Sequence, residues 1–306
     1  MGNQRQVFGE TLVEIGHEDE RIVVLEADLG KSTMTCLFKN EFPNRYFEMG
    51  IAEANMTSFA AGLALAGKIP FTNSFAVFSG GRAFDQIRQG ICTANLNVKI
   101  QGSSSGFSDY GDGATHQCIE DLAIMCALPN MTVLVPMDAA ETKKIVKAAV
   151  GHNGPVYIRN TRSETPDLSD AEKPFVIGEP EVIREGNDIV IFACGVMVSK
   201  AVEAASTLEG EGLSIRVVNV STLKPFPYKK VCELSQGFKG VVTAEEHSII
   251  GGLSASVAFG LKGIAIPIEC VAVEDVFGQS AEKHEDLLSE YKLTAESICD
   301  KVHKFI

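Results

Sequence analysis

The stretch RYFEMGIAEANMTSFAAGLALAG (residues 45–67) decides the fold, because it places one carboxylate at the start of an otherwise apolar helix. Residues 54–67 are rich in Ala, Gly and Met and carry no charge. This pattern predicts a helix over residues 53–66 that is buried almost all round. An ionised Glu53 in such a place is costly unless it is paired, so we expect it to hold its proton. The alternative is a structural glutamate that the helix macrodipole favours.

Two later segments carry candidate functional side chains. The segment PFTNSFAVF (residues 70–78) places Phe75 and Phe78 three residues apart after a strand-like run. Phenylalanines at this spacing are by default core residues. The segment SSSGFSDYGDGATHQ (residues 103–117) is a Gly/Ser/Asp loop that ends in His116 and Gln117. A loop histidine is usually solvated, but loops on a rigid scaffold are also where catalytic residues concentrate.

Taken together and in this order, these residues resemble the pyrimidine-binding half of transketolases, which are thiamine diphosphate enzymes. The motifs that carry the resemblance are EADLGKS (26–32), GIAEAN (50–55), FTNSFAVF (71–78), DGATHQ (112–117) and GPVYIRNTR (154–162). The resemblance continues through VTAEEHSIIGG and DVFGQSAEKHEDLLSEYKLT towards the C-terminus. It therefore covers nearly all of the chain, and five motifs in family order are far more specific than any one of them.

The resemblance implies a role for each candidate residue. Glu53 would hydrogen-bond to N1′ of the cofactor's aminopyrimidine and favour the imino tautomer that removes the thiazolium C2 proton. Phe75 and Phe78 would bracket the aminopyrimidine, with Phe75 as the main stacking partner. His116 would contact the oxygens of the sugar donor and move protons during C–C cleavage. The residues implied in substrate binding are Arg5, Asp28, Ser32, Asp112, His116 and Arg162, and Arg159 is a further cation available for an anionic substrate.

One departure from the family pattern concerns the sugar. Transketolases carry a second histidine before the loop histidine, and Ser104 stands at that place here. The sugar phosphate is therefore held differently, or the substrate differs, and hydroxyl and backbone donors of the Ser/Gly loop could serve instead. For Arg5 and Arg162 the structural alternative is an ion pair, although guanidinium forks suit phosphate well.

The other half of a transketolase is missing from this sequence. That half binds the cofactor diphosphate through Mg²⁺ with a GDG motif and a distant asparagine. The GDG at residues 111–113 does not fit, because Asn130 follows too closely and DGATHQ already matches the pyrimidine-binding half. The resemblance thus implies one subunit of a split transketolase, a homodimer alone and an α2β2 assembly with a complementary N-terminal subunit. That partner would supply most of the residues that bind Mg²⁺, and the two subunits together would transfer a two-carbon ketol unit between sugar phosphates.

Two other functions remain open at this point. One is a related thiamine enzyme, either the β subunit of a 2-oxo acid dehydrogenase or a deoxyxylulose-phosphate synthase. EADLGKS and the length between the phenylalanine pair and the THQ loop favour transketolase over both. The other is a non-catalytic partner subunit, against which the presence of Glu53, the phenylalanine pair and His116 in one chain speaks.

Composition limits the class of protein. The chain has 306 residues, 45% hydrophobic and 22% charged, which is typical of a globular protein with about two domains. Its net charge of −13 argues against nucleic acid or anionic membranes as partners. Eight cysteines without a C-x-x-C pair predict neither a disulfide framework nor a zinc site. The N-terminal residues lack an apolar signal region and no run is long enough to span a membrane, so we expect a cytoplasmic protein without a metal site of its own.

Alternating strand and helix patterns predict an α/β fold with two domains, each a mostly parallel sheet flanked by helices. We expect a pyrimidine-binding domain over residues 1–165, a linker with three prolines over 166–186, and a C-terminal domain over 187–306. The predicted strands are 22–26, 69–71, 98–101, 132–135, 156–159, 188–193, 214–220, 240–244 and 268–273. The predicted helices are 6–15, 53–66, 81–94, 139–150, 198–208, 228–235 and 253–261.

Overall fold

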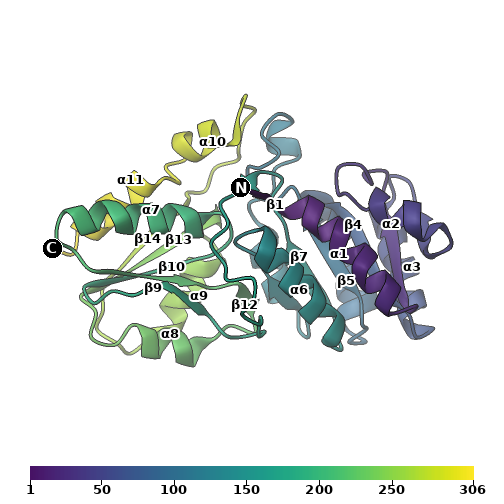
Figure 1. The fold of residues 1–306 in the computed structure, drawn as a ribbon, viewed down its shortest axis with the longest axis horizontal. Helices are drawn as coiled ribbons and strands as arrows, with labels where there is room; N and C mark the ends of the chain where they lie inside the picture. Colours follow the sequence, from purple (N-terminus) through teal and green to yellow (C-terminus); the bar gives the residue numbers. More distant parts are fainter.

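The chain forms two α/β domains that lie side by side in the computed structural model, which describes residues 1–306 (Figure 1). The N-terminus lies near the junction of the domains and the C-terminus at the far end of the second domain (Figure 1). Both domains have mostly parallel sheets with helices on both faces. The predicted fold class is therefore confirmed.

The first domain is built on a seven-stranded sheet with the order β12-β6-β7-β5-β4-β2-β3, in which only β12 is antiparallel to its neighbour. The central strands are buried at every residue, as expected for a parallel sheet covered on two faces, and β4 and β5 also bury polar side chains. The strands are β2 (Ile22–Glu26), β3 (Tyr46–Glu48), β4 (Ile69–Phe75), β5 (Lys99–Ser103), β6 (Thr132–Leu134), β7 (Val156–Arg159) and β12 (Thr222–Lys224).

Helices cover both faces of this sheet. Helices α1 (Gln4–Glu18) and α6 (Ala139–Gly151) lie side by side on one face (Figure 1). Asn3 and Asp138 cap them, each accepting a hydrogen bond from a backbone N–H of the first turn at 3.1 Å and 2.8 Å. The other helical segments are α2 (Cys36–Glu41), η1 (Pro43–Arg45), α3 (Glu53–Leu65), η2 (Val77–Arg82), α4 (Phe84–Gln86), η3 (Ile87–Cys92), η4 (Gly113–Thr115) and α5 (Asp121–Ala127).

The second domain has a five-stranded sheet with the order β14-β13-β10-β11-β9, parallel except for the edge strand β9. Helices α7 and α11 cover one face, and α8 and α9 cover the other (Figure 1). The elements are β9 (Glu181–Arg184), β10 (Ile189–Ala193), α7 (Met197–Gly210), β11 (Ile215–Asn219), α8 (Tyr228–Leu234), β13 (Gly240–Ser248), α9 (Leu253–Gly260), β14 (Ile268–Val273), α10 (His284–Glu290) and α11 (Ala295–His303).

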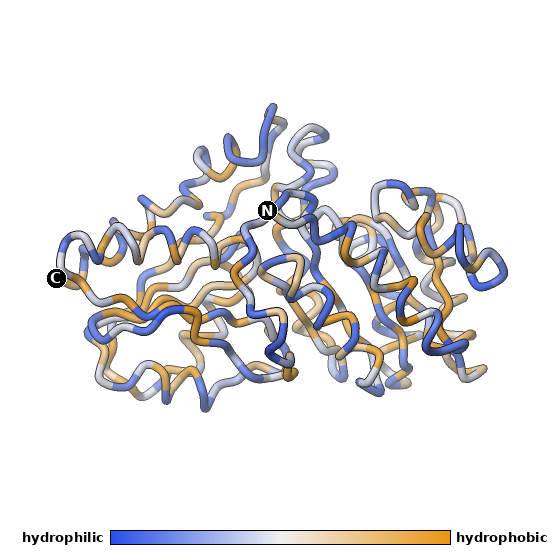
Figure 2. The backbone as a smooth tube through the Cα atoms, viewed as in Figure 1, coloured by the Kyte–Doolittle hydropathy of each residue, from blue (hydrophilic) through white to orange (hydrophobic).

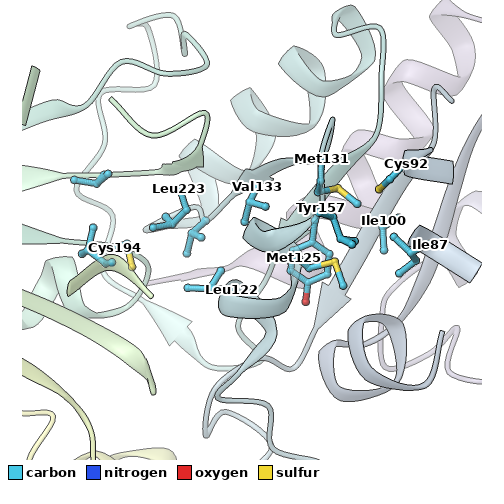
Figure 3. Packing of buried hydrophobic residues seen from close by; sticks show 14 of the residues in the cluster. Ile87, Cys92, Ile100, Leu122, Met125, Met131, Val133, Tyr157, Cys194 and Leu223 are labelled. Carbon is cyan, nitrogen blue, oxygen red and sulfur yellow. The ribbon is translucent and has the colours of Figure 1, made fainter. Parts of the chain in front are cut away.

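The two domains share a tightly joined boundary. Strand β12 leaves the second domain and pairs with β6 of the first. One apolar cluster runs across this boundary, with Val133 and Leu122 on one side and Leu223 and Cys194 on the other (Figure 3). Burying one aliphatic side chain completely stabilises the folded state by about 1.5–3 kcal/mol relative to leaving it exposed. A cluster of this kind therefore packs the two domains into one unit.

The predicted linker is shorter than the sequence suggested. Residues 181–184 form β9, which pairs antiparallel with β11, so they belong to the second sheet. The sequence pattern did not indicate β9, because all of its residues are half-buried at the edge of the sheet and its composition mixes charged and apolar residues. Before the linker, β8 (Glu164–Thr165) pairs antiparallel with β1 (Gly2–Asn3) and brings the N-terminus to the junction.

Two predicted helices differ from the structure. The predicted helix over 81–94 is a succession of η2, α4 and η3, in which the first and last segments have π-type hydrogen bonding. Helix α3 is not buried all round, because Phe59 and Leu65 keep 43% and 75% of their surface exposed. Figure 2 shows hydrophobic residues along many of the strands of both domains. None of the helices combines the length and apolarity that crossing a lipid bilayer requires.

Candidate active site

Glu53 lies at the first residue of α3, where its side chain is 1% exposed. Both carboxylate oxygens accept hydrogen bonds from Nη1 of Arg82, at 3.0 Å and 2.9 Å. The sequence predicted that Glu53 would hold its proton unless it is paired; the structure pairs this carboxylate with a guanidinium, and its protonation stays a prediction. Arg82 ends η2, and no motif in the sequence singled it out.

The two predicted phenylalanines lie beside this ion pair. Phe75 ends β4 and Phe78 lies in η2, and their rings stack with centroids 6.2 Å apart and planes 17° apart. The guanidinium of Arg82 lies over the Phe78 ring at 4.4 Å from its centroid. Phe75 is buried and Phe78 is half-exposed, so Phe78 is the more accessible surface for a flat ligand.

His116 packs against the same aromatic pair. Its ring meets Phe78 edge-on at a centroid distance of 5.3 Å and Phe75 at 6.4 Å. Its Nδ1 is 3.0 Å from the hydroxyl of Thr115. Glu53, Phe78 and His116 are therefore neighbours through Arg82 and the phenylalanine rings, although they come from three separate segments of the chain.

The loop over residues 104–118, which carries His116, is held by the second domain. Gln117 donates through Nε2 to the carbonyl of Gln279 at 2.9 Å. The backbone N–H of Phe107 donates to Glu246 at 2.9 Å. Gly106 has a φ of +59°, and an added Cβ would lie 2.3 Å from the Glu246 carboxyl group, so only glycine fits there.

A second group of predicted residues gathers around two arginines. Arg162 donates through Nη1 to the buried carboxylate of Asp109 at 2.8 Å. Arg5 donates through Nη1 to the backbone carbonyl of Ser32 at 2.8 Å, so these two predicted residues do lie together. Burial lowers the pKa of Arg5, and the nearby positive charge of Arg162 lowers it further. The two arginines therefore lie close enough for their charges to interact.

Asp28 and Ser32 lie on one loop, which Glu26 organises. The buried Glu26 carboxylate accepts hydrogen bonds from the hydroxyls of Thr33 and Thr35 at 2.8 Å and 2.7 Å. Burial raises the pKa of Glu26 to about 7 against the effect of these donors. Asp28 is exposed and has a φ of +60°, and no side-chain contact joins it to the other predicted residues.

Buried polar atoms without partners cluster at the ends of strands β4 and β5. The hydroxyls of Ser74, Ser103 and Ser104 are buried and unpaired, as are both polar atoms of the Gln101 side chain. Such groups are costly unless a ligand or water satisfies them. Ser104, at the place of the family histidine, has a φ of +52°. Like Ser74 and Ser103, it is completely buried.

These features fit the pyrimidine end of thiamine diphosphate. The site offers a buried carboxylate for a ring nitrogen and a half-exposed aromatic ring. Each oxygen of Glu53 accepts one hydrogen bond from Arg82 and has a further lone pair, so the carboxylate can accept from another group as well. No cluster of three or more His, Cys, Asp or Glu side chains is placed to hold a metal ion, and the expectation that a partner binds the Mg²⁺ stays a prediction.

Comparison with known proteins assigns both domains. The chain matches "Transketolase, pyrimidine binding domain" over residues 3–167 and "Transketolase, C-terminal domain" over residues 178–298. A "Putative transketolase C-terminal section" of Methanocaldococcus jannaschii is 41% identical, over 97% of this chain and 94% of that protein. A solved structure titled "Split gene transketolase, inactive beta4 tetramer" is similar with a TM-score of 0.92 and 48% identity, over 100% of this chain and 98% of that one.

Single-chain relatives are about twice as long. Human transketolase is 33% identical over 99% of this chain, but the alignment covers 49% of that protein. The chain therefore spans about half the length of such relatives and nearly the whole length of the archaeal C-terminal section. This chain belongs to the transketolase family and corresponds to its pyrimidine-binding and C-terminal domains.

Proposed function

We propose that this chain is the C-terminal subunit of a two-subunit transketolase that transfers a two-carbon ketol unit between a ketose phosphate and an aldose phosphate. The observation that carries the proposal is the cluster of Glu53, Phe78 and His116, which the fold assembles around Arg82 from three segments. A carboxylate, an aromatic face and a histidine are the side chains that this half of the site requires.

Each residue of the cluster has a separate task. Thiamine diphosphate, when bound, supplies the carbon nucleophile that carries the two-carbon unit. Glu53 would hold a ring nitrogen of the pyrimidine and thereby set its tautomer. Phe78, with Phe75 behind it, provides the flat apolar surface, and His116 holds or moves a proton at the sugar oxygens.

A complementary subunit would cover the exposed face of α3. Ile51, Phe59 and Leu65 are 74%, 43% and 75% exposed, and they lie on or just before this helix. A helix that is apolar on all sides is normally buried, and exposed apolar patches of this kind mark protein interfaces. We propose that the partner holds the cofactor diphosphate and Mg²⁺, and that two such pairs form an α2β2 tetramer. The structurally similar split-gene chain is titled an inactive β4 tetramer, which supports inactivity of the isolated subunit.

Subunit mixing tests the proposed activity. The isolated chain with thiamine diphosphate and Mg²⁺ should show little or no ketol transfer, and addition of the complementary N-terminal subunit should restore it. Robust turnover by the isolated chain would contradict the split-subunit proposal. Turnover of a 2-oxo acid donor by the mixture, without ketol transfer, would favour the related dehydrogenase or synthase activities instead.

The proposed interface is tested by one substitution and a matched control. Phe59→Ser should weaken assembly with the complementary subunit at least tenfold, measured by light scattering and titration calorimetry, because it removes an apolar side chain from the interface. Val176→Ser is the control, since Val176 is 54% exposed but lies in the segment between the domains. Equal assembly of both variants would place the interface elsewhere.

A further inference from the structure

The predicted anion-binding arginine already has an acidic partner in this chain. Arg162 donates to Oδ1 of Asp109 at 2.8 Å, and the Asp109 side chain is completely buried while that of Arg162 is 40% exposed. The second oxygen of Asp109, Oδ2, is buried and has no hydrogen-bond partner. No motif pointed to Asp109, and the proposed transferase mechanism assigns it no role.

The charges around Asp109 come from three segments of the chain. Arg162 follows β7, Arg5 lies on α1, and Asp112 and His116 share the loop of Asp109. Counting unit charges with neutral histidine, two cations face two carboxylates, so the site has no net positive charge. A doubly charged phosphate end of a sugar would therefore enter a site whose arginine is already neutralised, and like charges at contact distance are repulsive.

We propose that Asp109 is a specificity-determining residue that competes with the anionic end of the sugar for Arg162. A dianion binds there only when Asp109 takes up a proton, and sugars with a singly charged or uncharged end bind without that step. This inference rests on the proposed transferase function for its assignment of Arg162 to substrate binding.

The proton balance of the step follows from the two oxygens of Asp109. The N–H of Arg162 leaves Oδ1 and donates to an oxygen of the incoming anion. A proton from solvent binds the carboxylate, and the unpaired Oδ2 is the free position for it. Burial raises the pKa of Asp109 and the neighbouring Asp112 adds to this, while Arg162 and His116 act in the opposite direction. Of the two groups that lower the pKa of Asp109, Arg162 has the larger effect, so loss of this ion pair favours protonation of Asp109.

The test uses sulfate as the probe, because it remains a dianion over the whole range from about pH 6 to 8.5. Sulfate binding to the full-length chain is measured by titration calorimetry in two buffers of different ionisation enthalpy, which gives the number of protons taken up. For the wild type we expect weak binding that tightens as the pH falls, with proton uptake. Asp109→Asn keeps the size of the side chain and removes its charge, so it should bind sulfate at least tenfold more tightly and take up fewer protons.

Asp300→Asn is the matched control, because it makes the same charge change on the exposed side of α11. It should bind sulfate as the wild type does. The proposal is overturned if Asp109→Asn binds sulfate no more tightly than the wild type, including the case in which neither binds. It is equally overturned if the wild type binds sulfate tightly without proton uptake, a result that needs no variant to fold. The transferase proposal rests on Glu53 and on subunit mixing, so it survives either failure.

Discussion

Glu53→Gln should separate cofactor activation from folding. In the structure both oxygens of Glu53 accept from one nitrogen of Arg82, whose side chain is 49% exposed. Glutamine keeps the shape and one acceptor oxygen, and the guanidinium left without its ion pair is half-exposed, so the cost in unfolding free energy should be small, on the order of 1 kcal/mol. Proton transfer assisted by a positioned acid contributes about 10²–10⁴-fold, or about 3–5 kcal/mol in activation free energy. The substitution should therefore slow C2 proton exchange at least hundredfold in the assembled enzyme.

The assay follows deuterium incorporation at C2 of the cofactor by NMR after acid quench of the reconstituted complex. Urea denaturation of the isolated variant measures the folding cost separately. Asp85→Asn is the matched control, because Asp85 is an exposed acid on α4, three residues from Arg82. Exchange in Glu53→Gln within threefold of the wild-type rate would refute the assignment of Glu53, as would an equal loss in the Asp85→Asn control.

Three further outcomes follow from the contacts. Arg82→Gln in the isolated chain should lower the free energy of unfolding by about 1–3 kcal/mol in urea titrations, since it leaves the buried Glu53 carboxylate without its partner. The loss should be smaller when Arg82→Gln is combined with Glu53→Gln, which removes that charge. Arg162→Ala should raise KM for sugars with an anionic end by about tenfold, with C2 exchange retained, because it removes mainly uniform binding. Burial lowers the pKa of His284, but the charge and hydrogen bond of Glu246 reverse this and leave that pKa raised above 6.5. Its stabilisation is thus complete below about pH 6.5 and lost as the pH rises through the raised value, and His284→Asn should flatten that decline in melting temperature.

Most of the fold could be predicted because its strands are continuous apolar runs. Strands β2 and β7 have the predicted bounds, since each is buried along its whole length, and β14 has them although it lies at the edge of its sheet. The elements that sequence patterns missed are short or lie at an edge, as β9 and β12 do. For these the pairing partner, and not the local sequence, determines the structure: β12 pairs with a strand of the other domain.

The site could be predicted only where a motif marks a residue. Glu53, Phe75, Phe78 and His116 come from family motifs, and the structure does bring them together. No motif includes Arg82, because its importance arises from its contact with Glu53, which lies 29 residues away in the sequence. Burial alone suggested a neutral glutamate, and it could not indicate that a partner from another segment lies against this carboxylate with the opposite charge.

The second domain has a structural connection to the proposed chemistry, which the sequence could not indicate. Glu246, on β13, accepts hydrogen bonds from the backbone N–H of Phe107 at 2.9 Å and pairs with His284 at 2.6 Å. Its own carbonyl accepts from the buried guanidinium of Arg159 at 3.0 Å. The Glu246 carboxylate thus ties the loop over residues 104–118 to α10, and the backbone carbonyl of the same residue contacts β7. Because that loop carries the site's histidine, the C-terminal domain positions an active-site segment of its neighbour and does more than extend the fold.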